Sequence, residues 1–190
     1  MVTPKSSLVV FLRGVNVGGN KTLRPAELAR AIGAVNLGAA GTFVLHAGGS
    51  AGAIRKAIVA ELEFDAEVIV CTGSEVLDLV RRAGKTPPPY GKELKAMVTV
   101  LAKPPAAVPR LPVSTPAGAD WQVRVDRVDG PFVTSLWRRG EGRLIYPNEV
   151  VEKLFGIPGT TRGWSTIESI RKILEAGPPA RKKGVEGVKK

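Results

Sequence analysis

The stretch that decides the N-terminal fold is Ser7–Thr22, SLVVFLRGVNVGGNKT. Its first part, Ser7–Arg13, is a short apolar run rich in β-branched residues, which predicts a buried strand. Its second part, Gly14–Thr22, is a glycine-rich loop, and Pro25 favours the first position of a helix soon after it. A strand, a loop and a helix in this order predict a turn whose backbone N–H groups are open to an anion.

Apolar runs and helix caps alternate through the rest of the first half. Thr42–Ala47 and Glu67–Cys71 predict two more strands, and Ser50 and Ser74 are residue types that commonly cap the helices expected after them. The three prolines Pro87–Pro89 fit neither a helix nor a central strand. They therefore predict a stiff linker between two subdomains.

The second half of the chain is richer in strand patterns. The pattern predicts strands at Leu94–Ala102 and Trp121–Val128, a hairpin of Phe132–Arg138 with Arg143–Tyr146, a loop at Lys103–Gly118, and helices capped by Asn148 and by a Ser165–Glu168 capping box. We therefore expect an α+β fold with two small subdomains, residues 1–86 and 90–175, followed by a flexible basic tail at 176–190.

Composition excludes several classes of protein. A single Cys rules out an internal disulfide, and one Cys with one His cannot form a zinc site of the usual ligands. We expect neither a metal nor a cofactor. No apolar run reaches the roughly 18–20 residues that span a bilayer, and no export signal is recognisable. The sequence thus predicts a cytoplasmic protein with no membrane partner.

The chain is strongly basic, with 28 Lys and Arg against 17 Asp and Glu and a formal net charge of +11. The tail 176–190 carries much of this excess in a segment without apolar periodicity. Such a composition is typical of a solvated extension. The functional alternative is a weak attraction to nucleic acid, which salt abolishes.

The glycine-rich loop is the first candidate binding site. Gly14, Gly18 and Gly19 let the backbone take positive φ angles and let a ligand approach its N–H groups, and Lys21 adds positive charge. The loop nearly matches a P-loop, but an extra residue precedes the Lys-Thr pair, so a nucleotide triphosphatase is not expected. The plainer interpretation is a tight turn in which Asn16 bonds to local backbone.

The segment Gly159–Thr166, GTTRGWST, is the second candidate. Arg162 offers a planar fork of donors suited to a carboxylate or a phosphate, and Trp164 offers a ring for stacking. In the plainer interpretation, Trp164 fills the core, Arg162 forms a surface ion pair and Ser165 only caps a helix.

Other reactive side chains carry weaker signals. His46 ends one apolar strand and Cys71 closes another, and no third group is spaced to make them a nucleophile pair. Four acidic residues gather within Glu61–Glu67. This cluster lacks the glycine pattern of a calcium loop, so we interpret it as a solvated turn.

The two candidate segments together carry a family resemblance. Leu12–Gly19 (LRGVNVGG), followed by the helix Pro25–Ile32, resembles the N-terminal signature of a bacterial family called domain of unknown function 1697. Phe155–Thr166 (FGIPGTTRGWST) resembles its second signature. The resemblance covers about residues 7–175 and implies two α+β subdomains, each somewhat ferredoxin-like, with no established activity.

The resemblance indicates which positions belong to the family's site, and this sequence differs from the family pattern in two places. Position by position, it marks as site residues Arg13, Gly14, Asn16, Gly18, Gly19, Thr160, Arg162, Trp164 and Thr166. His46–Gly48 stands where family members have Ser-Gly-Asn, and Thr22 stands where they have Lys before the apolar residue. These departures put a family-typical function in question.

Our leading hypothesis is a small protein that binds an anionic ligand, phosphate-bearing or carboxylate, through loops 13–22 and 159–166. The residues marked above, with Lys21, would form the site where the two loops meet. The alternatives are nucleic-acid binding, non-specific or RNA-type, and an enzyme of unknown reaction that stabilises an anion. A further alternative is a protein that binds a partner through exposed edge strands.

Overall fold

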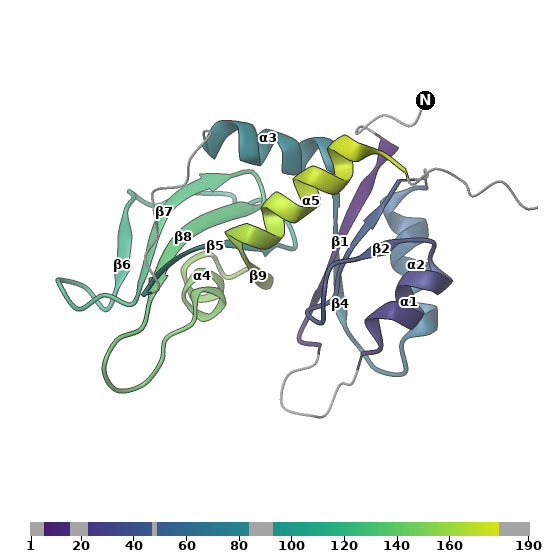
Figure 1. The fold of residues 1–190 in the computed structure, drawn as a ribbon. Coiled ribbons are helices and arrows are strands. Elements are labelled where there is room, and N and C mark those ends of the chain that lie inside the picture. The colour runs from purple at the N-terminus through teal and green to yellow at the C-terminus, as the bar shows by residue number, and fades with distance from the viewer. Residues whose placement is uncertain (1–5, 16–22, 47–48, 84–92, 179–190) are drawn as a thin grey trace, which may run out of the picture.

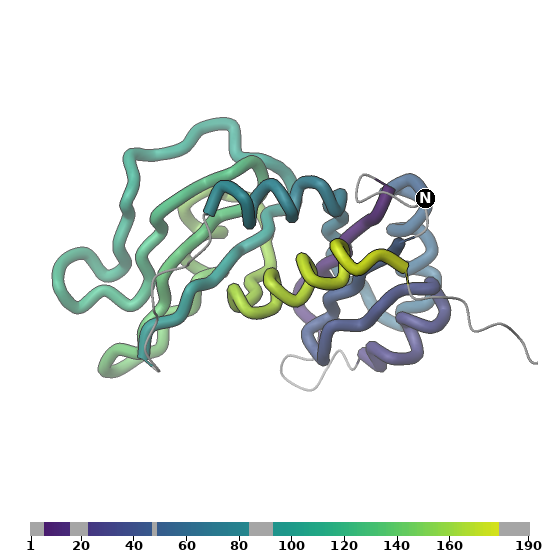
Figure 2. The backbone as a smooth tube through the Cα atoms, turned by 45° about the horizontal axis from the view of Figure 1, so that its top comes forward, coloured from purple at the N-terminus to yellow at the C-terminus, as the bar shows by residue number. Residues whose placement is uncertain are grey.

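The structure is a computed structural model that describes residues 6–15, 23–46, 49–83 and 93–178. Two antiparallel sheets stand side by side, and one long helix near the C-terminus crosses between them (Figure 1 and Figure 2). The expected α+β class is confirmed, because the helices accompany sheets with only antiparallel pairing in the described ranges. The expected subdomain limits at 86 and 90 lie outside these ranges.

The first sheet comes from a β-α-β-β-α-β succession with one further helix. Its elements are β1 (Leu8–Arg13), α1 (Pro25–Ala31), β2 (Val35–Asn36), β3 (Thr42–Leu45), α2 (Ala51–Glu61), β4 (Glu67–Thr72) and α3 (Gly73–Ala83). The strand order is β2-β3-β1-β4. Strand β1 therefore lies inside the sheet, with Val9 opposite both Val44 of β3 and Cys71 of β4.

Burial on both faces explains why β1 reads as a continuous apolar run. Val9 and Phe11 point to the side of the second sheet, and Val10 and Leu12 point to the side that α1 and α2 cover. All four side chains are almost completely buried. A strand with two covered faces needs apolar residues at every position, because neither face meets water.

The second sheet comes from the rest of the chain. Its elements are β5 (Leu94–Leu101), β6 (Val113–Thr115), β7 (Val123–Asp129), β8 (Phe132–Arg138), α4 (Pro147–Phe155), β9 (Gly159–Gly163) and α5 (Trp164–Ala176). The strand order is β6-β7-β8-β5-β9. This succession differs from that of the first sheet, and the ferredoxin-like character of the two units stays a prediction. Within the described ranges no helix is long and apolar enough to cross a bilayer.

Local signals set several helix ends as expected. Pro25 begins α1, the side chain of Ser50 accepts a hydrogen bond from the backbone N–H of Ala53, and Gly156 ends α4 with a left-handed φ of 64°. Helix α3 is different. Thr72, rather than Ser74, provides its cap: its hydroxyl accepts from Glu75 N and its own N–H donates to the Glu75 carboxylate.

Several expectations for the second half were wrong. The predicted loop Lys103–Gly118 contains the strand β6. Neither Asn148 nor Ser165 caps a helix: α4 begins at Pro147 after Tyr146, α5 begins at Trp164 after Gly163, and neither end has a side-chain cap bond.

Two further errors concern strand pairing. Arg143–Tyr146 is not a strand: β8 pairs instead with β7 and with β5, so the predicted hairpin is absent from the described structure. Gly159–Gly163 is a strand rather than a loop, because it pairs with β5 along its whole length. Short glycine- and threonine-rich segments carry little strand signal of their own, so the partner strand decided both outcomes.

A single apolar core joins the two sheets. It contains Val9 and Phe11 of β1, Val98 and Val100 of β5, and Ile167 and other residues of α5, all buried. Helices α1 and α2 cover the outer face of the first sheet, and α4 covers the outer face of the second. Because the inner core takes side chains from both sheets, we expect the two halves to unfold together.

Phe11→Ala tests this expectation. Removing a fully buried ring from the shared core should lower the free energy of unfolding by about 3–5 kcal/mol. The three tryptophans lie in the second half of the chain, so tryptophan fluorescence follows that half while circular dichroism follows both. Both signals should shift together in urea. Val59→Ala, on the exposed face of α2, is the control and should change stability by less than about 0.5 kcal/mol. A fluorescence transition that stays at the wild-type position would show that the halves unfold independently.

Candidate functional site

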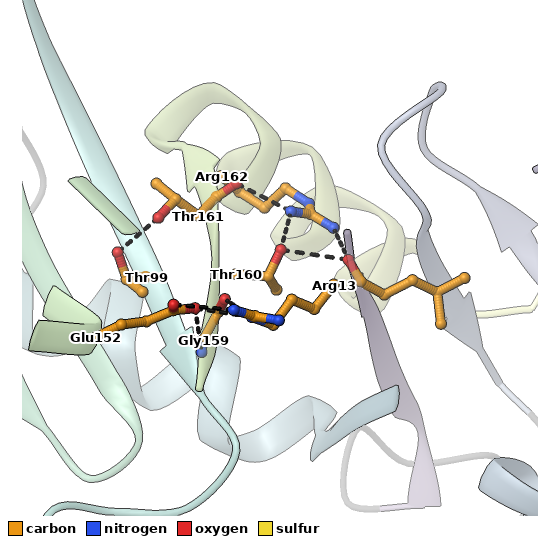
Figure 3. A network of polar contacts seen from close by, with 8 residues as sticks. Arg13, Thr99, Glu152, Gly159, Thr160, Thr161 and Arg162 are labelled. Atoms are coloured by element: carbon orange, nitrogen blue, oxygen red, sulfur yellow. Dashed lines mark hydrogen bonds and ion pairs between the residues drawn. The ribbon is translucent and has the colours of Figure 1, made fainter. Parts of the chain in front are cut away.

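The end of β1 meets β9 at a set of polar contacts that we call the seam. It consists of contacts among β1, the segment 40–42, α4 and β9 (Figure 3). These segments are far apart in the sequence, and the seam joins the first sheet to the second. Both candidate segments from the sequence contribute to it, the first through Arg13 and the second through Arg162.

The guanidinium of Arg162 occupies the centre of the seam. The residue is only 7% exposed although it carries a charge. Its five N–H donors meet acceptors from both sheets: Nε donates to Thr42 Oγ1 at 2.7 Å, Nη1 to Thr160 Oγ1 at 2.7 Å and Thr161 O at 2.9 Å, and Nη2 to Leu12 O at 3.0 Å, Ala40 O at 2.5 Å and Gly41 O at 3.4 Å. The planar fork is therefore fully hydrogen-bonded by the protein itself.

All of these acceptors are neutral. In the part of the chain that the structure describes, Arg162 makes no ion pair, and its closest ring contact is Phe11, with the guanidinium carbon 5.9 Å from the ring centroid. Burial lowers the pKa of Arg162 to about 10, because removal from water disfavours the charged form. At neutral pH the side chain still carries its charge, so the seam holds a buried cation without a carboxylate bonded to it.

Gly41 gives the backbone the shape that this arrangement needs. Its φ is +68°, and a Cβ there would lie 2.8 Å from Leu12 Cβ and 2.9 Å from Val15 Cγ2. Only glycine allows that approach without displacement. The Gly41 carbonyl consequently accepts from both Leu12 N, at 2.8 Å, and the Arg162 side chain.

Arg13 makes the second polar link across the seam. Its Nε and Nη2 donate to the two carboxylate oxygens of Glu152 at 2.8 and 2.9 Å, and Nε also donates to Gly159 O at 3.1 Å. The Glu152 carboxylate accepts in addition from Gly159 N at 2.9 Å. The Arg13 and Glu152 side chains are 40% and 23% exposed, so this pair lies nearer the solvent than Arg162.

The two partners of this pair shift each other's pKa in opposite directions. The hydrogen bond from Arg13 holds the pKa of Glu152 below its ordinary value of 4.5, and Gly159 N–H acts in the same direction while burial opposes it. The hydrogen bond to Glu152 raises the pKa of Arg13. Both groups are therefore ionised at neutral pH, and Glu152 is not a proton donor there.

The structure brings some of the sequence-predicted residues together. Arg13, Thr160 and Arg162 meet in the seam, where Thr160 Oγ1 donates to Leu12 O at 3.3 Å. Gly14 follows directly, exposed and with a φ of +73°. The loop residues predicted to contact the ligand lie outside the described residues: Asn16, Gly18, Gly19 and Lys21. Ligand binding by this set stays a prediction.

Two other predicted residues take different positions. Trp164 begins α5 and is buried in the shared core, and its Nε1 has no partner in the described structure. Thr166 lies in the first turn of α5, half-buried. Trp164 thus fills the core, as the plainer interpretation had it. Arg162, in contrast, is not the surface ion-pair partner of that interpretation, because it is buried and bonded to neutral oxygens.

Sequence reasoning missed Glu152 and the acceptors in the segment 40–42. Glu152 lies in the middle of α4, 139 residues from Arg13, and no local pattern distinguishes it from an ordinary surface carboxylate. Gly41 is one of several isolated glycines in the sequence, and an isolated glycine only weakly indicates a position that needs a positive φ. Only the packing of α4 beside β9 brings the carboxylate to the seam, so a local motif could not have revealed it.

Two cavities of the described structure lie away from the seam. One, of about 1270 Å³, opens at the end of the second sheet beside Lys95, Trp137 and Arg138. Another of about 330 Å³ lies between α1 and α2. Neither is lined by Arg13 or Arg162. The solvent-facing side of the seam carries the half-buried Arg13 and the exposed Gly14.

Cys71 and His46 show no sign of reactivity. Burial raises the pKa of the Cys71 thiol to about 12, so the thiolate is scarce at neutral pH. Burial lowers the pKa of His46, and its Nε2 makes no hydrogen bond to a described residue. Among the described residues, no group of three or more His, Cys, Asp and Glu side chains is placed to hold a metal ion.

Arg162→Ala tests how much the hydrogen bonds of the seam contribute to the free energy of unfolding. The substitution leaves buried carbonyl and hydroxyl oxygens of both sheets without a donor, and each such loss costs about 1–3 kcal/mol. We expect the free energy of unfolding to fall by at least about 3 kcal/mol, measured by urea denaturation. The matched control is Arg143→Ala, which removes an exposed pair with Glu149 and should cost less than about 1 kcal/mol. Equal losses in the two variants would contradict this assignment.

The Arg13–Glu152 pair predicts a pH dependence. Because the folded-state pKa of Glu152 lies below 4.5, its contribution to stability is complete above that value and is lost as the pH falls through the folded-state pKa. Glu152→Gln should be less stable than wild type near neutral pH, and the gap should narrow as the pH falls from about 6 to about 3. Urea denaturation across this range measures the gap, and a constant gap would contradict the prediction.

Comparison with known protein families gives one match for this chain. Residues 6–128 match the family described as "Protein of unknown function (DUF1697)". This span runs from β1 into β7, so it includes Arg13 and the glycine-rich loop and ends before β9. No curated protein and no solved structure matches the chain. Since the match covers well over half of the 190 residues, the chain belongs to the DUF1697 family.

Proposed function

We propose that the protein binds an anionic ligand at the solvent-facing side of the seam, next to the loop that follows β1. The observation that supports this most is the buried charge of Arg162. A buried charge without an ionic partner is unfavourable in a folded protein even where its donors are hydrogen-bonded. An anion close by would supply the missing negative charge.

Arg162 would act on the ligand through its electric field. All its N–H groups are already bonded to Thr42, Thr160 and backbone carbonyls, so it has no donor left for a direct contact. Charge–charge interactions are stronger in the low-dielectric interior than in water, and salt screens them less there. A buried guanidinium therefore attracts an anion over a distance at which an exposed one would be screened.

Arg13 and the loop that begins at Gly14 would make the direct contacts. Nη1 of Arg13 makes no hydrogen bond to a described residue, while Nε and Nη2 hold the side chain in place on Glu152. Gly14, Asn16, Gly18, Gly19 and Lys21 would add backbone N–H groups and a further cation. The ligand class that suits these donors is a phosphate-bearing or carboxylate compound, which we expect to be met in the cytoplasm.

Nucleic-acid binding is the second candidate, and one observation favours it. At the end of the second sheet, the Trp121 ring contacts two cations, Arg124 and Arg138, whose guanidinium carbons lie 5.3 and 4.3 Å from the ring centroid. Aromatic rings among cations suit single-stranded nucleic acid. Against this, the neighbouring cavity is also lined by three carboxylates, those of Glu93, Asp120 and Glu141, which repel phosphates.

Thermal denaturation with a panel of anions tests the proposal. The probes are inorganic phosphate, adenosine monophosphate and a short oligoribonucleotide, each compared with chloride at equal ionic strength. A probe present at about ten times its Kd should raise the Tm by a few degrees. Arg13→Gln should abolish the shift, and the control Arg143→Gln, which removes the same charge from the exposed pair with Glu149, should keep it.

Two outcomes would overturn the proposal. If no probe shifts the Tm of the wild-type protein beyond chloride, the seam does not bind these anions. If only the oligoribonucleotide shifts it, equally in wild type and Arg13→Gln and with a steep loss as salt rises, then the second candidate replaces the first.

A further inference from the structure

We propose that Glu152 is an internal occupant of a carboxylate site, and that a ligand with a carboxylate of its own binds by displacing it. The carboxylate site consists of Nε and Nη2 of Arg13 and the backbone N–H of Gly159. This inference rests on the proposed function, because it names the chemical group that the seam takes and the contact that controls its access.

The geometry around Glu152 is that of a bound carboxylate. One oxygen, Oε1, accepts from Arg13 Nε at 2.8 Å and from Gly159 N at 2.9 Å, and the other, Oε2, accepts from Arg13 Nη2 at 2.9 Å. A guanidinium fork that meets two oxygens of one planar group, together with a backbone amide, is an arrangement that recognises carboxylates in particular. Glu152 therefore shows which group the site fits (Figure 3).

The backbone donor of the site is fixed without help from Glu152, and Arg13 keeps one further contact of its own. Gly159 is held in β9 by its pairing with Leu101 of β5, and a Cβ at this position would lie 3.0 Å from Thr99 Cγ2. Arg13 ends β1 opposite Glu67, and its Nε also donates to the Gly159 carbonyl at 3.1 Å. The pairing of β9 with β5 thus positions the Gly159 N–H, and the contact with the Gly159 carbonyl keeps Arg13 Nε beside it.

The occupant, in contrast, reaches the site by a flexible side chain. Glu152 belongs to α4, which Val150 and Val151 anchor in the core independently of the carboxylate. Its side chain is 23% exposed, so rotation about its side-chain bonds can move the carboxylate into water while the helix stays in place. The site can therefore open without unfolding any element.

An internal carboxylate controls which ligands bind. Because Glu152 is tethered, it competes like a ligand at an effective concentration in the millimolar range or above. A small free anion such as formate cannot displace it at ordinary concentrations. A larger ligand that also contacts the exposed Gly14 and is attracted by the charge of Arg162 can displace it, so the internal carboxylate selects for larger carboxylate compounds.

Glu152→Ala should open the carboxylate site to small carboxylates. We expect sodium formate or acetate at about 100 mM to raise the Tm of this variant by roughly 2–4 °C relative to sodium chloride at equal ionic strength. Wild type should show no carboxylate-specific shift. The matched control is Glu149→Ala, which removes a carboxylate from the same helix but from the exposed pair with Arg143, and it should behave as wild type.

Two further variants complete the test. Glu152→Gln keeps the side-chain volume but places an amide among three donors, so formate should stabilise it too, even if Glu152→Ala does not fold. The double variant Arg13→Gln/Glu152→Gln lacks the guanidinium and should lose the response to formate. An absence of any carboxylate-specific shift in both single variants, or its persistence in the double variant, overturns the proposal.

Failure of the carboxylate-site proposal and failure of the proposed function give different results in these experiments. Formate binding by the Glu152 variants, with no anion response in wild type, would establish the carboxylate site but show that the probes do not displace Glu152. Phosphate or nucleotide binding by wild type, with no formate response in the variants, would support the proposed function and reject the carboxylate site.

Discussion

The guanidinium of Arg162 joins the two sheets at the point where β1 ends and β9 runs past it. Its planar fork reaches carbonyls of the first sheet and hydroxyls of both sheets at once. An ammonium group has three donors on a single atom and could not serve acceptors spread in this way. Because the side chain is buried, each acceptor depends on it, and the relative position of the sheets depends on this contact and on the apolar core beside it.

The same contact gives the seam its electrostatic character. Arg162 is bonded only to neutral oxygens, whereas Arg13 is neutralised by Glu152. The two guanidinium groups of the seam thus differ in their surroundings: that of Arg162 is buried and that of Arg13 is partly exposed. A surface pair can open and close at little cost, while a buried charge stays fixed. This difference supports the roles proposed here, a permanent field from Arg162 and an exchangeable contact at Arg13.

Much of the fold was predictable where the signal is local. The apolar run of β1, Pro25 at the start of α1, Ser50 as a cap and Gly156 as a stop all act within a few residues, and the structure has them as expected. Predictions failed where the partner decides the outcome. Gly159–Gly163 became a strand because β5 offers it a free edge, and Arg143–Tyr146 did not because β7 and β5 already flank β8.

The sequence by itself determined the α+β class, the starts of α1 and α2 and the two segments that carry glycine and arginine. It did so because periodicity, capping and backbone freedom are properties of short stretches. Tertiary structure alone decided that Arg162 is buried and that four of its six acceptors come from segments 120 to 150 residues away. It also decided that Glu152 accepts hydrogen bonds from Arg13. Those facts depend on how two sheets pack, and no short stretch of the chain contains that information.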